Sequence, residues 1–496
     1  MRTTFLTFII LCFSLTLHGA EIKVPLQSEA LKNTSYSFYA KYVDGEDILT
    51  INPELRLTPG SLIKLFTTAA AIEYMGPEHK FKTEIYFDGK KNIFGTLKGN
   101  VYIKGGGDPS LGSNRIKTNP SMEEILDFWA SRIESQEIKK IDGDIIADVS
   151  LFSGNNLPPK TAWEDMGNYF GATSEALNFN DNMFTLRFKP QPQKLSLVEF
   201  DSMSPQVERI SVKSYVVTDP FSSSDEIYIF AAPGQFELIA RGTVPIKTTA
   251  SYVYASLPDP PLFTAQQFKN ELLKRGIKIT GRARVSYGNF NYTDKTLLAS
   301  SYSPALFEII NIINKKSFNL YSEVLLKNIA VFNTGIGSTE QGIIEVENFL
   351  RAQNNLTDNF KIYDGSGLSR NSFVNTKTVI TFLENMTKKP YFEIFYNSLL
   401  TPAGEEKHRL KNAFSNSPAF DLHMKTGFLT GVRSYSGYIK DCNGKMITFS
   451  FIVNNYTVTT NEINKIFEDI LSSLSNIGRP PPATKKAAGN IKKQTS

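Results

Sequence analysis

The feature that most restricts the fold is a segment near the beginning of the sequence, from Thr58 to Gly76, which predicts a helix with apolar residues on every side. Pro59 suits the first helical position and Gly76 suits the residue that ends a helix. The apolar positions are Leu62, Ile63, Leu65, Phe66, Ala69, Ala70 and Ile72. A helix of this kind is stable only when other elements surround it. We therefore expect a central helix inside a large domain, which a chain of 496 residues is long enough to build.

The two ends of the chain share one organisation, and the middle differs from both. Two strands with a turn at Asp44-Gly45 are expected in 36–57. Towards the other end, strands are expected at 420–426, 434–440 and 445–453, the last two around Asn443-Gly444, with a helix near 461–476. Between about 85 and 290, short strand-like runs are broken by proline, glycine and serine. The predicted fold class is therefore α+β, with one domain built from both ends and interrupted by a large β-rich insertion.

These patterns divide the chain into units. The predicted units are a signal peptide (1–20), a discontinuous domain (21–85 with 290–478), inserted domains (86–289, with a second one nested at roughly 105–180) and a basic disordered tail (479–496). The tail has the composition of a segment that cannot bury a core, because it combines three consecutive prolines with scattered lysines.

The first twenty residues predict export to the periplasm. Arg2 supplies a positive charge, Phe5 to Leu17 forms an apolar stretch of the right length, and Gly19-Ala20 offers a cleavage site. An N-terminal membrane anchor is the alternative interpretation of the same segment. No later segment is long and apolar enough to span a bilayer, so we expect at most a peripheral contact with the membrane.

The formal net charge of +5 arises at the two ends of the chain. Of the 54 lysines and arginines, one precedes residue 21 and five follow residue 478, whereas all 49 acidic residues lie between them. The body is nearly neutral and has no basic character that favours nucleic acid. After removal of 1–20, Cys442 is the one remaining cysteine, and no histidine pair has metal-ligand spacing. We expect no disulfide, no metal and no organic cofactor.

Ser61 and Lys64 lie three positions apart at the start of the predicted central helix, so their side chains share one face. A serine hydroxyl becomes a strong nucleophile when a base removes its proton. Burial in an apolar wall lowers the pKa of a lysine and allows it to be that base. Backbone N–H groups at the start of the helix are available to stabilise an oxyanion. Because such a pair also arises by chance, the interpretation depends on further motifs.

Two further motifs follow, Ser317-Phe318-Asn319 and Lys425-Thr426-Gly427. Ser-x-x-Lys, Ser-x-Asn and Lys-Thr-Gly, in this order, form the set used by penicillin-recognising serine enzymes. With them the sequence resembles the D-alanyl-D-alanine carboxypeptidase/endopeptidase family, the class C low-molecular-mass penicillin-binding proteins. The resemblance covers the mature chain except the tail. The stretches that agree with it are Gly105–Pro109, Trp163–Asn178 and Asp364–Arg370.

The resemblance implies a penicillin-binding/β-lactamase-like transpeptidase domain, with an antiparallel sheet and helices, and a serine carboxypeptidase or endopeptidase activity. Ser61 would attack the carbonyl between two terminal D-alanines, with Lys64 as the general base. Ser317 would relay a proton to the leaving amine, and Asn319 would orient the substrate and Lys64. The implied partners are peptidoglycan stem peptides and β-lactams that acylate Ser61, and the enzyme would act as a monomer or a homodimer.

The resemblance also implies substrate-binding residues. Lys425 and Thr426, followed by Gly427, would hold the terminal carboxylate. The N–H groups of Ser61 and Phe428 would form the oxyanion hole. Arg370 would face the side chain of the substrate, near a contribution from the insertion around Asp148 and Phe152.

Two residues depart from the family pattern. Phe318 occupies a position that is usually polar, and Phe428 one that is usually small and hydroxylated. We expect the Phe318 side chain to point away from the cleft, whereas Phe428 would remove a hydroxyl contact to the carboxylate and keep the backbone donor. Both departures are the support for one alternative, a non-catalytic peptidoglycan-binding envelope protein.

A β-lactamase is the second alternative, since such enzymes share the three motifs but need a glutamate that activates water. Glu175-Ala176-Leu177-Asn178 resembles that motif loosely. A Ser-His-Asp hydrolase is disfavoured because the chain has no Gly-x-Ser-x-Gly elbow.

Overall fold

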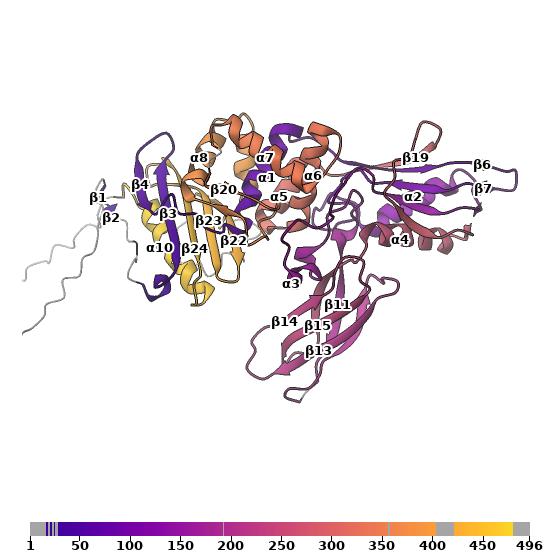
Figure 1. Ribbon diagram of the computed structural model, residues 1–496, viewed down its shortest axis with the longest axis horizontal. Helices are drawn as coiled ribbons and strands as arrows, with labels where there is room; N and C mark the ends of the chain where they lie inside the picture. The colour runs from indigo at the N-terminus through magenta and orange to yellow at the C-terminus, as the bar shows by residue number, and fades with distance from the viewer. Residues whose placement is uncertain are drawn as a thin grey trace, which may run out of the picture.

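The computed structural model describes residues 16–17, 20–21, 24, 28–191, 193–355, 358–402 and 421–479. The predictions of a signal peptide and a disordered tail fall almost wholly outside these residues. Figure 1 shows two parts, a lobe that combines the indigo and the orange-to-yellow segments, and a magenta insertion between them in sequence.

The first lobe is built around a five-stranded antiparallel sheet with the order β22-β23-β24-β3-β4. Its strands are β3 (Ser35–Tyr42), β4 (Asp47–Ile51), β22 (Leu422–Leu429), β23 (Val432–Lys440) and β24 (Met446–Asn454). Because β24 pairs with β3 along its whole length, the sheet unites the two ends of the chain. This arrangement confirms the predicted α+β class with an interrupting insertion.

Helices cover both faces of this sheet. On one face α10 (Thr460–Ser475) packs its apolar stripe, including Ile463 and Phe467, against the strands. On the other face lie α1 (Ile63–Met75), α5 (Leu306–Asn311), α6 (Asn319–Thr334), α7 (Thr339–Ala352), α8 (Thr376–Thr387) and α9 (Phe392–Ser398). Every residue of α1 from Ile63 to Ile72 is buried. The prediction of a central helix is therefore confirmed.

The insertion leaves and rejoins this lobe through two paired strands, β5 (Lys82–Phe87) and β19 (Thr296–Tyr302). They belong to a sheet with β8 (Val101–Lys104), β10 (Ile145–Asp148) and β18 (Ala283–Ser286), on which α2 (Met122–Glu134) and α4 (Pro260–Lys274) pack. The structure also has short strands: β6 (Lys90–Lys91), β7 (Thr96–Lys98), β9 (Lys140–Ile141), β17 (Lys278–Ile279), β20 (Phe360–Lys361) and β21 (Phe373–Val374).

Six strands between Met183 and Ser256 form a second unit of the insertion, which lies lowest in Figure 1. They are β11 (Met183–Lys189), β12 (Glu199–Ser204), β13 (Ser211–Asp219), β14 (Glu226–Phe230), β15 (Glu237–Pro245) and β16 (Ser251–Ser256). They make two three-stranded sheets. These strands begin after the predicted nested range of 105–180, which contains α2, β10 and α3 (Trp163–Met166) instead.

Helix α6 joins the insertion to the first lobe. The hydroxyl of Tyr321 donates to Asp181 (3.0 Å), and the side-chain amide of Asn328 donates to the Gly107 carbonyl (2.8 Å). Gly107 has a positive φ of 72°, and a Cβ there would lie 2.4 Å from the Asn328 amide oxygen. The helix that follows the Ser-x-Asn motif is therefore docked on the insertion. Over the part of the chain that is described, each helix is too short or too polar to cross a membrane.

Candidate active site

Ser61 and Lys64 come together where a 3-10 turn (Gly60–Leu62) leads into α1. The Lys64 side chain is completely buried, and its Nζ lies 2.9 Å from Ser61 Oγ. The same nitrogen donates to the side-chain oxygen of Asn319 (2.7 Å) and the carbonyl of Ser366 (2.6 Å). A neutral amine held in this position has the geometry to accept the hydroxyl proton of Ser61.

The Ser-x-Asn motif links the two lysines of the other motifs. Ser317 has a left-handed backbone (φ 58°, ψ 37°) after a π-helical turn, Ile312–Lys316, and Asn319 begins α6. Such a conformation is strained for a residue with a side chain and concentrates at functional sites. Ser317 Oγ accepts a hydrogen bond from Lys425 Nζ (2.9 Å), while Asn319 accepts from Lys64. The motif therefore connects both buried amines.

The third motif lies on β22, at the edge of the sheet. Lys425 is fully buried, and its Nζ also donates to the Thr426 carbonyl (2.7 Å). A Cβ on Gly427 would lie 2.6 Å from the Pro59 carbonyl oxygen and 3.1 Å from the Ser61 nitrogen. Only glycine lets the strand approach the nucleophile this closely. The Phe428 side chain is exposed, and its main-chain nitrogen would lie 3.3 Å from a Cβ on Gly60, so the main chains of Ser61 and Phe428 meet here.

Two buried acids, Glu323 and Asp364, hold the loop beside Lys64. Glu323 accepts from the N–H groups of Gly365 (3.0 Å) and Ser366 (2.8 Å). Burial and the charge of Asp364 raise the pKa of Glu323, burial raises the pKa of Asp364, and the charge of Lys64 lowers both. The acids fix the Ser366 carbonyl that accepts from Lys64. Sequence reasoning missed Glu323, although Asp364 belongs to a segment that it singled out.

Arg370 lies at the exposed end of the same loop, where its guanidinium donates to the Thr430 carbonyl (3.0 Å). The charge of Arg370 acts on the carboxylate of Asp165, an acidic residue of the insertion on α3. Burial raises the pKa of Asp165 to about 6, and Arg370 opposes this shift. Asp148 is buried at the end of β10, where its carboxylate accepts from the Ser150 N–H and the Tyr292 hydroxyl. Its role in substrate binding stays a prediction, whereas Asp165 was missed.

The segment that follows α3 covers the Ser-x-Asn motif. The side-chain amide of Asn319 donates to the Phe170 carbonyl (2.8 Å). The Phe318 ring is buried, stacks on Tyr169 (centroids 6.1 Å apart), and lies 3.8 Å from the Arg115 guanidinium carbon. The middle residue of the motif therefore packs against the insertion and points away from the cleft, as the sequence predicted.

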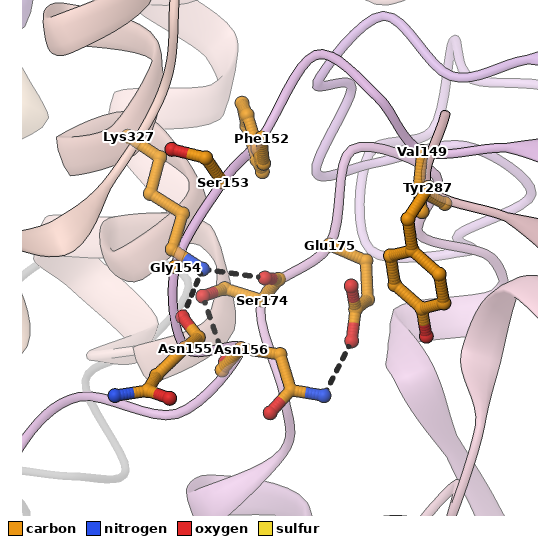
Figure 2. Close-up of a pocket in the computed structure, with 10 residues that line it drawn as sticks. All are labelled: Val149, Phe152, Ser153, Gly154, Asn155, Asn156, Ser174, Glu175, Tyr287 and Lys327. Atoms are coloured by element: carbon orange, nitrogen blue, oxygen red, sulfur yellow. Dashed lines mark hydrogen bonds between the residues drawn. The ribbon is translucent and has the colours of Figure 1, made fainter. Parts of the chain in front are cut away.

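Glu175, the residue on which the β-lactamase alternative depends, lies in a separate cavity. Its carboxylate accepts from the side-chain amide of Asn156 (3.0 Å) beside Lys327 (Figure 2). Lys327 follows Asn319 on α6 by about 12 Å at 1.5 Å per residue. Glu175 is thus placed as part of the junction between insertion and lobe, and the geometry gives no support to a water-activating role at Ser61.

Comparison with known families agrees with this geometry. The model of the D-Ala-D-Ala carboxypeptidase 3 (S13) family matches residues 19–474. The chain belongs to this family. As a member of the S13 family it is a serine peptidase.

Characterised relatives of this S13 enzyme carry matching names. It is 25% identical over 425 residues to the D-alanyl-D-alanine carboxypeptidase of Actinomadura sp. (strain R39), covering 83% of this chain and 76% of the relative. It is 24% identical over 434 residues to the D-alanyl-D-alanine carboxypeptidase DacB of Haemophilus influenzae, covering 86% of each chain.

Solved structures show the same fold. The crystal structure of penicillin binding protein 4 (dacB) from Haemophilus influenzae matches with a TM-score of 0.77 at 22% identity, covering 90% of this chain and 97% of that one. A complex of the same protein with a novel β-lactam matches with a TM-score of 0.71 at 20% identity, covering 88% and 95%. The predicted penicillin-binding fold with a large insertion is therefore confirmed.

Proposed function

We propose that this S13 enzyme removes the terminal D-alanine from peptidoglycan stem peptides through an acyl-enzyme on Ser61, and that β-lactams acylate the same serine. The observation that supports this most directly is the 2.9 Å contact between Nζ of the fully buried Lys64 and Oγ of the partly exposed Ser61. Export to the periplasm, where the substrate lies, is part of the proposal.

In the first half-reaction, Lys64 accepts the hydroxyl proton as Ser61 Oγ bonds to the carbonyl carbon of the penultimate D-alanine. The N–H groups of Ser61 and Phe428 stabilise the oxyanion. The C–N bond then breaks, and the amine of the terminal D-alanine takes the hydroxyl proton of Ser317, which regains one from Lys64. The Ser317 oxygen also accepts a hydrogen bond from Lys425. The peptide remains as an ester on Ser61.

In the second half-reaction, water attacks the ester carbon and gives a proton to Lys64, and the Ser61 oxygen regains a proton as it leaves. Lys425 and Thr426 bind the terminal carboxylate of the substrate, because they lie on β22 beside the nucleophile. Arg370 and Asp165, of opposite charge, stand at the boundary of loop and insertion and bind a charged side chain of the stem peptide.

The test is incubation with a labelled penicillin followed by intact mass over hours. We expect a stable adduct on the wild-type protein and on Ser222→Ala, a control on an exposed loop of the insertion, and none on Ser61→Ala. Rapid loss of the adduct with accumulation of hydrolysed drug would identify a β-lactamase. A complete absence of adduct would favour the non-catalytic envelope protein.

A further inference from the structure

A cavity of about 220 Å³ lies at the junction between α6 and the insertion, outside the catalytic cluster (Figure 2). Lys327 enters it from α6, and Asn156, Ser174 and Glu175 enter it from the insertion. The volume is far above the roughly 10–15 Å³ that a single water needs. The proposed reaction uses none of these residues, so the cavity needs an explanation of its own.

The cavity has a buried charge of each sign. The exposed fraction is 1% for Lys327 and 8% for Glu175. Lys327 Nζ donates to the carbonyls of Asn155 (3.0 Å) and Ser174 (2.8 Å), and Glu175 accepts from the Asn156 amide (3.0 Å). Within the described chain these two charges form no direct ion pair. An ammonium has three N–H groups, so Lys327 keeps one for a further acceptor.

Two opposite charges buried this deeply normally form a direct ion pair. Each charge has lost its hydration, and a partner within contact distance compensates for that loss. Here the backbone holds them apart, since Lys327 is bonded to the carbonyl of Ser174, the residue before Glu175. Burial raises the pKa of Glu175 and lowers the pKa of Lys327 although the two charges attract each other. The cavity is therefore lined by one buried cation and one buried anion that are not paired with each other.

Other acids near the pair do not fill this role. Glu323 and Glu340 act on Lys327, and Asp259 acts on Glu175, only through longer-range electrostatics. The ring of Phe152 lies 5.6 Å from Lys327 Nζ and closes one wall with an apolar surface. The remaining wall is polar and reaches the exposed residue Ser153, which leaves an entrance.

We propose that this cavity binds a small free amino acid as a zwitterion, with its ammonium group at Glu175 and its carboxylate at Lys327. The two charges of a zwitterion then complement the two buried charges that line the cavity. Free D-alanine is the natural probe, a choice that rests on the proposed function, because the reaction at Ser61 releases it. The binding chemistry itself does not depend on that reaction.

The experiment is a calorimetric titration of the full chain with D-alanine, and in parallel with L-alanine, glycine, acetate and methylammonium. We expect the amino acids to bind, and the two single-charge ions to bind at least tenfold more weakly. Glu175→Gln and Lys327→Met should each weaken amino-acid binding at least tenfold. Glu226→Gln, which removes the same charge from an exposed position on β14, should bind as the wild type does.

Ser153→Trp provides a second test of the site. The substitution fills the entrance of the cavity from an exposed position and leaves both buried charges in place. Loss of binding in this variant, with an unchanged melting temperature, supports the site even if a charge variant fails to fold. Equal D-alanine binding in the wild type and the three cavity variants would show that the ligand binds outside this cavity and overturn the proposal, as would no binding at all. Formation of the penicillin adduct is scored separately, so the two proposals fail independently.

Discussion

The cleft around Lys64 and the junction around Lys327 each bury a lysine amine almost completely, yet their surroundings differ. Lys64 lies within hydrogen-bond distance of a hydroxyl, a side-chain amide and a carbonyl. Both acceptors of Lys327 in the described chain are main-chain oxygens, and the side chain across the cavity is a carboxylate. Burial alone therefore does not make a lysine a catalytic base. A nucleophile must lie within reach of the amine.

The largest difference between the two regions should appear when each amine is removed. Lys64→Met should slow acylation by a labelled penicillin by roughly 10²–10⁴-fold, the range for loss of a general base. Rapid-quench measurement of the acylation rate tests this, with circular dichroism as the control for folding. Near-normal acylation would show that another group takes the proton of Ser61.

Phe318 connects the cleft to the insertion, because its ring packs on Tyr169 while its neighbours in the chain contact Lys64 and Lys425. Phe318→Ser should lower the free energy of unfolding by about 3–5 kcal/mol, as expected for truncation of a buried ring. A shift of Asn319 by about 1 Å would also slow acylation by up to about 10²-fold. Urea unfolding and the acylation rate measure the two effects.

Phe318→Leu keeps an apolar side chain, so it should lose less stability and less acylation rate than Phe318→Ser. If Phe318→Ser were as stable and as fast as the wild type, the cleft would not depend on its contact with the insertion.

Lys327→Met should affect stability more than acylation, whereas Lys64→Met should mainly affect acylation. The substitution leaves the buried carboxylate of Glu175 without the positive charge of Lys327, so the free energy of unfolding should fall by about 3 kcal/mol. Acylation should change less than tenfold, because Lys327 lies far along α6 from Asn319. A loss of acylation as large as that of Lys64→Met would mean that the two regions are not separate.

The smallest effect is expected from Asp165, a residue of the insertion on whose carboxylate the charge of Arg370 acts. Its pKa of about 6 lies above the ordinary value of 3.8, so the folded state holds its proton more tightly than the unfolded state does. The free energy of unfolding should therefore fall, by about 1 kcal/mol for this half-buried group, as the pH rises from about 4 to about 6. Asp165→Asn should reduce this fall by about 1 kcal/mol in urea unfolding at several pH values. An unchanged slope would assign it to other acids such as Asp108, whose pKa burial also raises to about 6.

Much of the first lobe was predictable from the sequence, because its signals are local. The apolar helix, the strands around Asn443-Gly444 and the three motifs each depend on residues close together in the chain. The strand pattern predicted 434–440 and 445–453, and the structure has Val432–Lys440 and Met446–Asn454.

The surroundings of the cleft were not predictable in the same way. Which loop of the insertion approaches Arg370 depends on how the insertion docks on α6, through contacts such as Tyr321 to Asp181, 140 residues apart in sequence. No local pattern distinguishes Asp165 from Asp148 as the acid on that side. Glu323 was missed for a similar reason, since its role follows from the distant loop that it binds.

The pairing of β3 with β24 has a consequence for the chain during its synthesis. The hydroxyl of Thr448 donates to the Lys41 carbonyl, 407 residues earlier, so the ribosome completes one strand long before its neighbour exists. The insertion, with a core of its own, is synthesised in between. Ser61 is therefore present for most of synthesis without the strand that holds Lys425, and the three motifs can meet only when the last strands are made.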